Sequence, residues 1–66
     1  MKEYGTATTN GKDNKMEIEY DFDTNILFNK TMNHKTNMEL KEYKRMKENT
    51  IKTFKNKGYI LKFVTV

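Results

Sequence analysis

The most constraining feature of this sequence is a strictly alternating segment over residues 15–22. The alternation is formed by Met16, Ile18, Tyr20 and Phe22 on one side and by Glu17, Glu19 and Asp21 on the other. Because successive side chains of a β-strand point to opposite faces, the pattern predicts a half-buried strand. The Thr-rich segment 3–9 predicts a preceding strand, and Asn10-Gly11 supplies residues suited to a tight connection.

The register of these strands can be argued from parity, because a one-residue shift moves every side chain to the opposite face. A two-residue loop would set Tyr4 against Glu17, so we favour an odd loop over residues 10–14. The predicted pairs are Tyr4 with Tyr20, Thr6 with Ile18 and Thr8 with Met16. A three-residue turn at 23–25 likewise pairs Phe22 with Ile26 and Tyr20 with Phe28. It predicts a third, short strand over residues 26–30.

A single long helix is predicted over residues 37–56. Thr36 and Glu39 have the spacing of a capping box, in which each side chain accepts from the other residue's backbone N–H. Apolar residues recur at helical spacing at Leu40, Tyr43, Met46, Ile51 and Phe54, with Thr50 completing the stripe. Gly58 stands where a left-handed C-terminal cap is expected, after Lys55 and Lys57.

Residues 59–66 are aromatic and β-branched except for Lys62, which predicts a strand with two largely apolar faces. The fold class is therefore α+β. The predicted order is β-β-β-α-β, with antiparallel hairpins and one long helix on one face of a four-stranded sheet. A strand, helix and strand in series favour a right-handed parallel crossover that brings the last strand beside the first.

The chain has 66 residues and no Cys, so a single small domain over 1–66 is expected, without disulfides or thiolate metal sites. A domain of this size buries only about 60% of the surface of its unfolded chain. The absence of Cys favours a cytoplasmic location. No segment has the length and apolar content of a signal peptide or a membrane span, and no membrane association is expected.

The candidate chemical motifs are weak. Asp21, Asp23 and Asn25 begin like a calcium loop, but Ile26 and Met32 occupy the positions that require Gly and Glu. We favour the interpretation that these polar side chains close a hairpin turn by Asx-type hydrogen bonds. His34 lies in a polar linker, 31–35, with no acid or Cys near it in sequence. We therefore expect no catalysis, metal, cofactor or small-molecule substrate.

Charge is concentrated in the second half of the chain. Residues 1–33 carry four Lys and six acids, whereas residues 34–66 carry nine basic side chains and three acids. The candidate nucleic-acid-binding residues are Lys41, Lys44, Arg45, Lys52 and Lys55, on the helix face opposite the apolar stripe. Two readings compete with this one: a composition bias of the genome toward Lys and Asn, and a solvated face in which Glu42 and Glu48 pair with neighbouring cations.

The second candidate surface is the sheet face away from the helix. If the helix covers Tyr4, Ile18, Tyr20, Phe28, Leu61 and Phe63, the outer face carries Ala7, Leu27, Ile60, Val64 and Val66, bordered by Glu17, Glu19, Asp21 and Lys62. An apolar patch with a charged rim is typical of protein-binding surfaces. The candidate partner-binding residues are Leu27, Ile60, Val64, Val66, Glu17 and Glu19. A loosely packed face that binds nothing is the competing reading.

These surfaces predict a non-catalytic regulatory or inhibitory protein that binds another protein or a second copy of itself. An accessory product of a mobile element fits this class. The alternatives are a Lys-rich nucleic-acid-binding module of weak sequence specificity that uses helix 37–56, and a structural subunit of a larger assembly.

Overall fold

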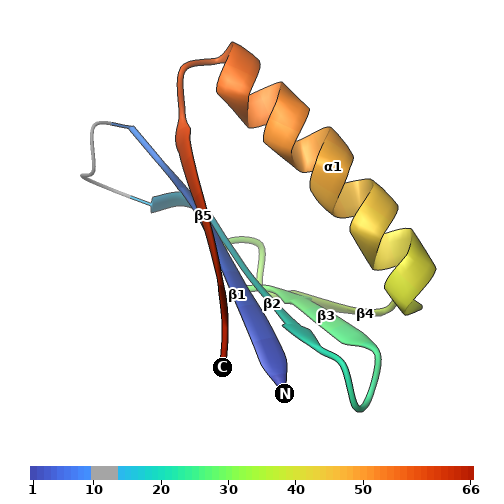
Figure 1. Cartoon of the computed structure of the whole chain (residues 1–66). Helices are drawn as coiled ribbons and strands as arrows, with labels where there is room; N and C mark the ends of the chain where they lie inside the picture. The colour runs from blue at the N-terminus through green and yellow to red at the C-terminus, as the bar shows by residue number, and fades with distance from the viewer. Residues whose placement is uncertain (10–13) are drawn as a thin grey trace.

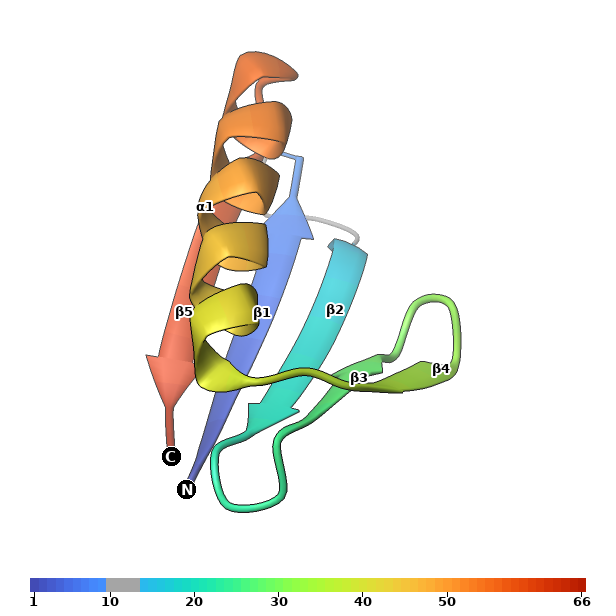
Figure 2. The ribbon, with the colours of Figure 1, turned by 90° about the vertical axis from the view of Figure 1, so that its right-hand side faces the viewer.

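The computed structural model describes residues 1–9 and 14–66. The predicted connection at Asn10-Gly11 lies outside these residues. The elements are β1 (Lys2–Thr8), β2 (Asn14–Asp21), β3 (Ile26–Asn29), β4 (His34–Asn37), α1 (Leu40–Asn56) and β5 (Ile60–Thr65). The strands form one antiparallel sheet in the order β4-β3-β2-β1-β5, and α1 lies on one face of it (Figures 1 and 2). The α+β class is confirmed, although the sheet has five strands and not four.

The additional strand is β4, which pairs antiparallel with β3 from Ile26↔Asn37 to Asn29↔His34. The predicted linker and capping box fall in this region and are wrong. The Thr36 hydroxyl lies 3.1 Å from Nδ1 of His34 within the strand. The helix begins at Leu40 after Glu39, whose side chain makes no capping hydrogen bond. Pairing with β3 satisfies backbone groups that the prediction had assigned to the first turn of the helix.

The register of β1 against β2 differs from the prediction by one residue. Gly5 pairs with Ile18 and Ala7 with Met16, so Tyr4 stands opposite Glu19 on the outer face. The inner face of β1 thus carries Glu3, Gly5 and Ala7, all of which are buried. Small side chains are needed there because the ring of Phe63 lies directly over Gly5.

The register of β2 against β3 is also shifted by one residue from the prediction. Tyr20 pairs with Leu27 and Asp21 with Ile26, which leaves the four residues 22–25 in the turn. Asn25 closes this turn with a φ of 58°, a conformation that Asn tolerates better than most residues. Leu27 is therefore buried on the helix side, and Ile26 and Phe28 face outward.

The last strand lies beside β1, as predicted, but it runs antiparallel to it. The predicted parallel direction is wrong because β4 reverses the chain once more before the helix. The helix connects β4 and β5 at opposite edges of the sheet (Figure 2).

The C-terminal end of α1 confirms the predicted glycine cap. The Tyr59 N–H donates to the Phe54 carbonyl and the Gly58 N–H to the Lys55 carbonyl, each at 3.0 Å. Gly58 has a φ of 84°, and the rings of Phe54 and Tyr59 lie 5.2 Å apart. These are the bonds and the apolar contact of a Schellman motif, which turns the chain into β5.

The core lies between α1 and the inner face of the sheet. Its buried apolar residues are Ala7, Met16, Ile18, Tyr20, Leu27 and Tyr43. The rings of Tyr20 and Tyr43 stack at 4.0 Å. The Tyr20 hydroxyl donates to the Met38 carbonyl at 2.6 Å and accepts from the Asn25 amide at 2.9 Å. The same side chain therefore anchors the helix and the segment that leads into it.

Candidate functional site

The outer face of the sheet carries an exposed apolar row on β5. Ile60, Val64 and Val66 have exposed fractions of 59%, 43% and 74%, while Leu61 and Phe63 between them are half-buried against the helix side. Lys62 interrupts the row on the same face, and Tyr4 of β1 stands opposite Val64. The row therefore lies along one edge of the sheet, where a partner could reach it.

A belt of charges lies on the same outer face, with Lys2 on the adjacent strand β1 and Glu19 on β2, one strand further from the row. Glu19 accepts from Lys2 at 2.9 Å and from Lys30 at 3.3 Å, and the Lys30 ammonium lies 5.1 Å from the centre of the Tyr4 ring. The hydrogen bond from Lys2 is the main cause that lowers the pKa of Glu19 below its ordinary value. Glu17 lies on the same face, half-buried. These contacts order the charged side chains around the apolar row.

Two residues expected on this face lie on the other one. Ala7 and Leu27 are buried beneath the helix, because both strand registers are shifted by one residue. Tyr4 and Phe28, expected in the core, take the outer positions instead, and the Lys35 ammonium lies 5.4 Å from the centre of the Phe28 ring. Of the six predicted partner-binding residues, Ile60, Val64, Val66, Glu17 and Glu19 share the outer face, and Leu27 does not.

A polar cluster beneath the helix was not predicted. The carboxylate of Glu3, a buried residue near the start of β1, accepts from the Tyr43 hydroxyl at 2.6 Å and from the Lys47 ammonium at 2.8 Å. Thr65 donates to its other oxygen at 3.4 Å. The sequence signal that could have indicated this cluster is the four-residue spacing of Tyr43 and Lys47, which places two hydrogen-bond donors on one face of the helix.

The protonation of this cluster follows from its surroundings. Burial raises the pKa of Glu3, but hydrogen bonds from Lys47 and Tyr43 outweigh burial, so the pKa lies below its ordinary value. Burial, followed by the hydrogen bond to the Glu3 carboxylate, raises the pKa of Tyr43. The Glu3 carboxylate is therefore ionised, and it accepts a hydrogen bond from the Tyr43 hydroxyl, which stays protonated. The cluster fastens α1 to β1 and β5.

The basic face of α1 is open to solvent. Lys41, Lys44, Arg45, Lys52 and Lys55 are all exposed. Within residues 1–9 and 14–66, none of them takes part in an ion pair, so the expected pairs with Glu42 and Glu48 are not formed. Lys47, at the margin of this face, instead bonds Glu3 and lies 4.6 Å from the centre of the Phe63 ring.

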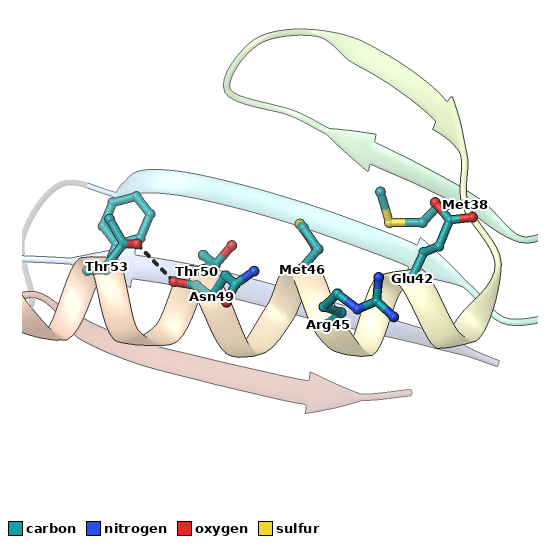
Figure 3. Close-up of a pocket in the computed structure, with 8 residues that line it drawn as sticks. Met38, Glu42, Arg45, Met46, Asn49, Thr50 and Thr53 are labelled. Atoms are coloured by element: carbon teal, nitrogen blue, oxygen red, sulfur yellow. Dashed lines mark hydrogen bonds between the residues drawn. The ribbon is translucent and has the colours of Figure 1, made fainter.

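A shallow hollow of about 460 Å³ runs along the side of α1 that faces the β3–β4 hairpin (Figure 3). Its lining surface is mostly apolar, from residues that include Met38, Met46 and Phe54, and Glu42, Arg45 and Asn49 of the helix add polar groups. A second hollow of about 260 Å³ lies on the outer face between Glu19, Phe28 and Lys35.

The remaining candidate motifs have local structural partners. The Asp21 carboxylate accepts from the backbone N–H groups of Asp23 at 2.8 Å and Thr24 at 3.3 Å, as expected for an Asx turn. His34 is exposed on β4. Among the residues that the structure describes, no three His, Cys, Asp or Glu side chains are grouped so that they could hold a metal ion.

Comparison with protein-family models, with curated proteins and with solved structures finds no match for this chain. The one helix of the described residues does not have the length and apolar content to cross a bilayer. The geometry of the surfaces is therefore the basis for a functional proposal.

Proposed function

We propose that this chain is a non-catalytic regulatory or inhibitory protein that acts by binding another protein through the outer face of its sheet. The observation that carries the proposal is the exposure of Ile60, Val64 and Val66 on one strand, where each could have been polar without loss to the core. Apolar side chains that face water beside a charged belt gain free energy when a partner covers them.

The charged belt adds specificity to this surface. Glu19 is held between Lys2 and Lys30, so its carboxylate is fixed in place before a partner arrives. Ordered charges at the rim of an interface favour partners of complementary charge and disfavour others. A partner that binds only the folded state also stabilises a small domain with no disulfide.

The experiment is a capture assay with the immobilised chain, followed by binding measurements on each captured protein after purification. Ile60→Asp combined with Val64→Asp should abolish binding and leave the far-UV spectrum unchanged. Lys44→Glu with Lys52→Glu serves as the matched control, because it changes charge on the helix face only. Binding that survives the outer-face substitutions contradicts the proposal.

A second candidate function is nucleic-acid binding through α1, and it is favoured because the cations of its basic face form no ion pairs with the part of the chain that the structure describes. Cations without partners in the protein are free to neutralise phosphates and release counterions. Only one of these five residues is an Arg, the side chain that best recognises guanine through two hydrogen bonds, so weak sequence discrimination is expected. Lys44→Glu with Lys52→Glu should remove the binding of a random-sequence duplex together with its salt dependence. Unchanged binding rejects this candidate.

A further inference from the structure

The two edges of the sheet differ in how well they are protected. The edge strand β4 has four polar residues, His34–Asn37. The opposite edge strand, β5, has six residues with Lys62 as its one charge and no Pro. Natural proteins shield exposed edges with short strands, charges, prolines or bulges, because unpaired backbone groups invite another strand. Each edge strand carries one Lys and no Pro, so β4 is the better shielded by its shortness and its polar side chains, and β5 is the more open edge.

The backbone groups on the open edge can be identified from the pairing with β1. Lys2 and Val66 exchange both hydrogen bonds, N–H to carbonyl in each direction, at 3.0 and 2.8 Å. Hydrogen-bonded pairs alternate along an antiparallel ladder, so Val64 and Lys62 also direct their backbone groups toward β1. The N–H and C=O groups of Leu61, Phe63 and Thr65 therefore point away from the sheet.

We propose that a second copy of this chain pairs with this edge, β5 antiparallel to β5, to form a two-fold symmetric dimer. The proposal rests on the proposed protein-binding surface, because it names the partner of that surface. With the two-fold axis at Phe63, all three outward-facing residues pair: Phe63 with its own copy, and Leu61 with Thr65 twice. These pairs exchange about six hydrogen bonds.

The side chains distinguish this register from its neighbour. Centred on Phe63, the pairing sets Lys62 opposite Val64 and Ile60 opposite Val66 on the outer face, and the apolar row continues from one copy into the other. A two-residue shift that centres the axis on Lys62 would set the two Lys62 side chains directly opposite each other. Like charges at directly opposed positions are destabilising, so the register centred on Phe63 is preferred to the one centred on Lys62.

Backbone hydrogen exchange tests the pairing residue by residue. In the dimer the amide hydrogens of Leu61, Phe63 and Thr65 are protected, whereas in the monomer they face solvent. Those of Lys62 and Val64 are protected in both states and serve as internal controls. We expect dilution through the dimer dissociation constant to lower the protection of the three outward amides at least tenfold. If these amides exchange freely at millimolar concentration while the controls stay protected, the pairing is wrong.

The register is tested by placing opposite charges at Val64. Val64→Lys sets a cation opposite Lys62 at two symmetry-related sites, and Val64→Glu sets an anion there. The dimer dissociation constants of the two variants should differ by about tenfold or more, with Val64→Glu the tighter. Thr6→Lys and Thr6→Glu, on the same face but one strand inward, should differ far less. Equal weakening by both Val64 variants overturns this register.

The outcomes also separate this proposal from the broader one. A chain that stays monomeric at millimolar concentration overturns the edge pairing. Capture of another protein that depends on Ile60 and Val64 can still succeed in that case, so failure of the edge pairing is distinguishable from failure of the protein-binding proposal.

Discussion

The ring of Phe63 lies over Gly5 so closely that a β-carbon on the glycine would stand 2.5 Å from its Cε1 atom and 3.0 Å from Cγ1 of Ile18. This contact holds β5 against the inner face of β1 and explains why a glycine stands in the middle of a strand. Gly5→Ala should therefore lower the free energy of unfolding by about 1–3 kcal/mol, as in other overpacked cores. Without the contact, the same change would stabilise a strand by about 0.5–1 kcal/mol.

Urea denaturation at one fixed protein concentration measures this effect. The double variant Gly5→Ala with Phe63→Leu should be less destabilised than the sum of the single changes, because the smaller side chain leaves room for the new methyl group. Additive effects would show that the ring is not what excludes a side chain at position 5.

The lowered pKa of Glu3 predicts a specific pH dependence of stability. A carboxyl group whose folded pKa lies below its unfolded value contributes stability above the unfolded pKa and loses it as the pH falls through the folded one. The ordinary value is 4.5, so the contribution is complete near neutral pH and declines below about that value. Glu3→Gln should cost about 1.5–3 kcal/mol at pH 7.

The measurement is the free energy of unfolding of both proteins between pH 7 and pH 3. The difference between them isolates Glu3 from Glu19 and Asp21, whose pKa values are also lowered. We expect the difference to shrink on acidification. A difference that stays constant with pH would contradict an ionised, hydrogen-bonded Glu3.

Tyr43→Phe removes the phenolic donor to Glu3 and leaves the ring stacked on Tyr20. We expect a loss of about 1–2 kcal/mol in the free energy of unfolding, because a buried carboxylate loses one of its hydrogen bonds. Tyr59→Phe is the matched control, since the Tyr59 hydroxyl has no hydrogen-bond partner within the described residues. It should change stability by less than about 0.5 kcal/mol. Equal effects of the two substitutions would exclude a role for the Tyr43 hydroxyl.

Gly58→Ala tests the cap at the end of α1. No atom lies within 4 Å of the position that the new β-carbon would occupy, so any cost comes from the backbone, with φ at 84°. The expected loss is about 1–2 kcal/mol, the cost of a left-handed conformation for a residue with a side chain. Lys57→Ala, at a φ of −90°, should have little effect on the thermal midpoint. A Gly58→Ala variant as stable as the original chain would contradict the cap.

The features predicted correctly from the sequence are those encoded by local patterns. The alternation at residues 15–22 identified β2, and the Gly58 signal identified the end of the helix and the start of β5. In each case a short segment carries its own periodicity or backbone requirement. The position of β5 beside β1 was also predicted correctly, although the prediction assumed a parallel crossover and β5 runs antiparallel to β1 at the edge of the sheet.

The features predicted wrongly depend on packing between distant segments. The inner positions of β1 are Glu3, Gly5 and Ala7, of which only the small Ala7 is apolar. Gly5 is small because Phe63 lies above it, and Glu3 is tolerated because Tyr43 and Lys47 descend from the helix. The parity argument paired large side chains with each other and therefore predicted the wrong register for β1 against β2. The same argument gave the wrong register for β2 against β3 and so placed Leu27 on the outer face.

The strand β4 was missed for a different reason. His34–Asn37 has no apolar side chain, and Thr36 with Glu39 imitates a helix start. The strand β4 is stabilised by backbone hydrogen bonds to β3, and these bonds impose no recognisable pattern on its side chains. The basic helix face is exposed, as predicted, and the pairs with Glu42 and Glu48 that the competing interpretation allowed do not form among the described residues.

The most direct test of where this protein acts is its molar mass by light scattering after size exclusion, at rising concentration and with a random-sequence duplex. We expect a dimer whose molar mass is unchanged by the duplex at low and moderate salt, because the proposed interaction surface is β5 and the outer face of the sheet. A monomer that shifts only with the duplex, and only at low salt, would contradict it and assign function to the basic face of α1.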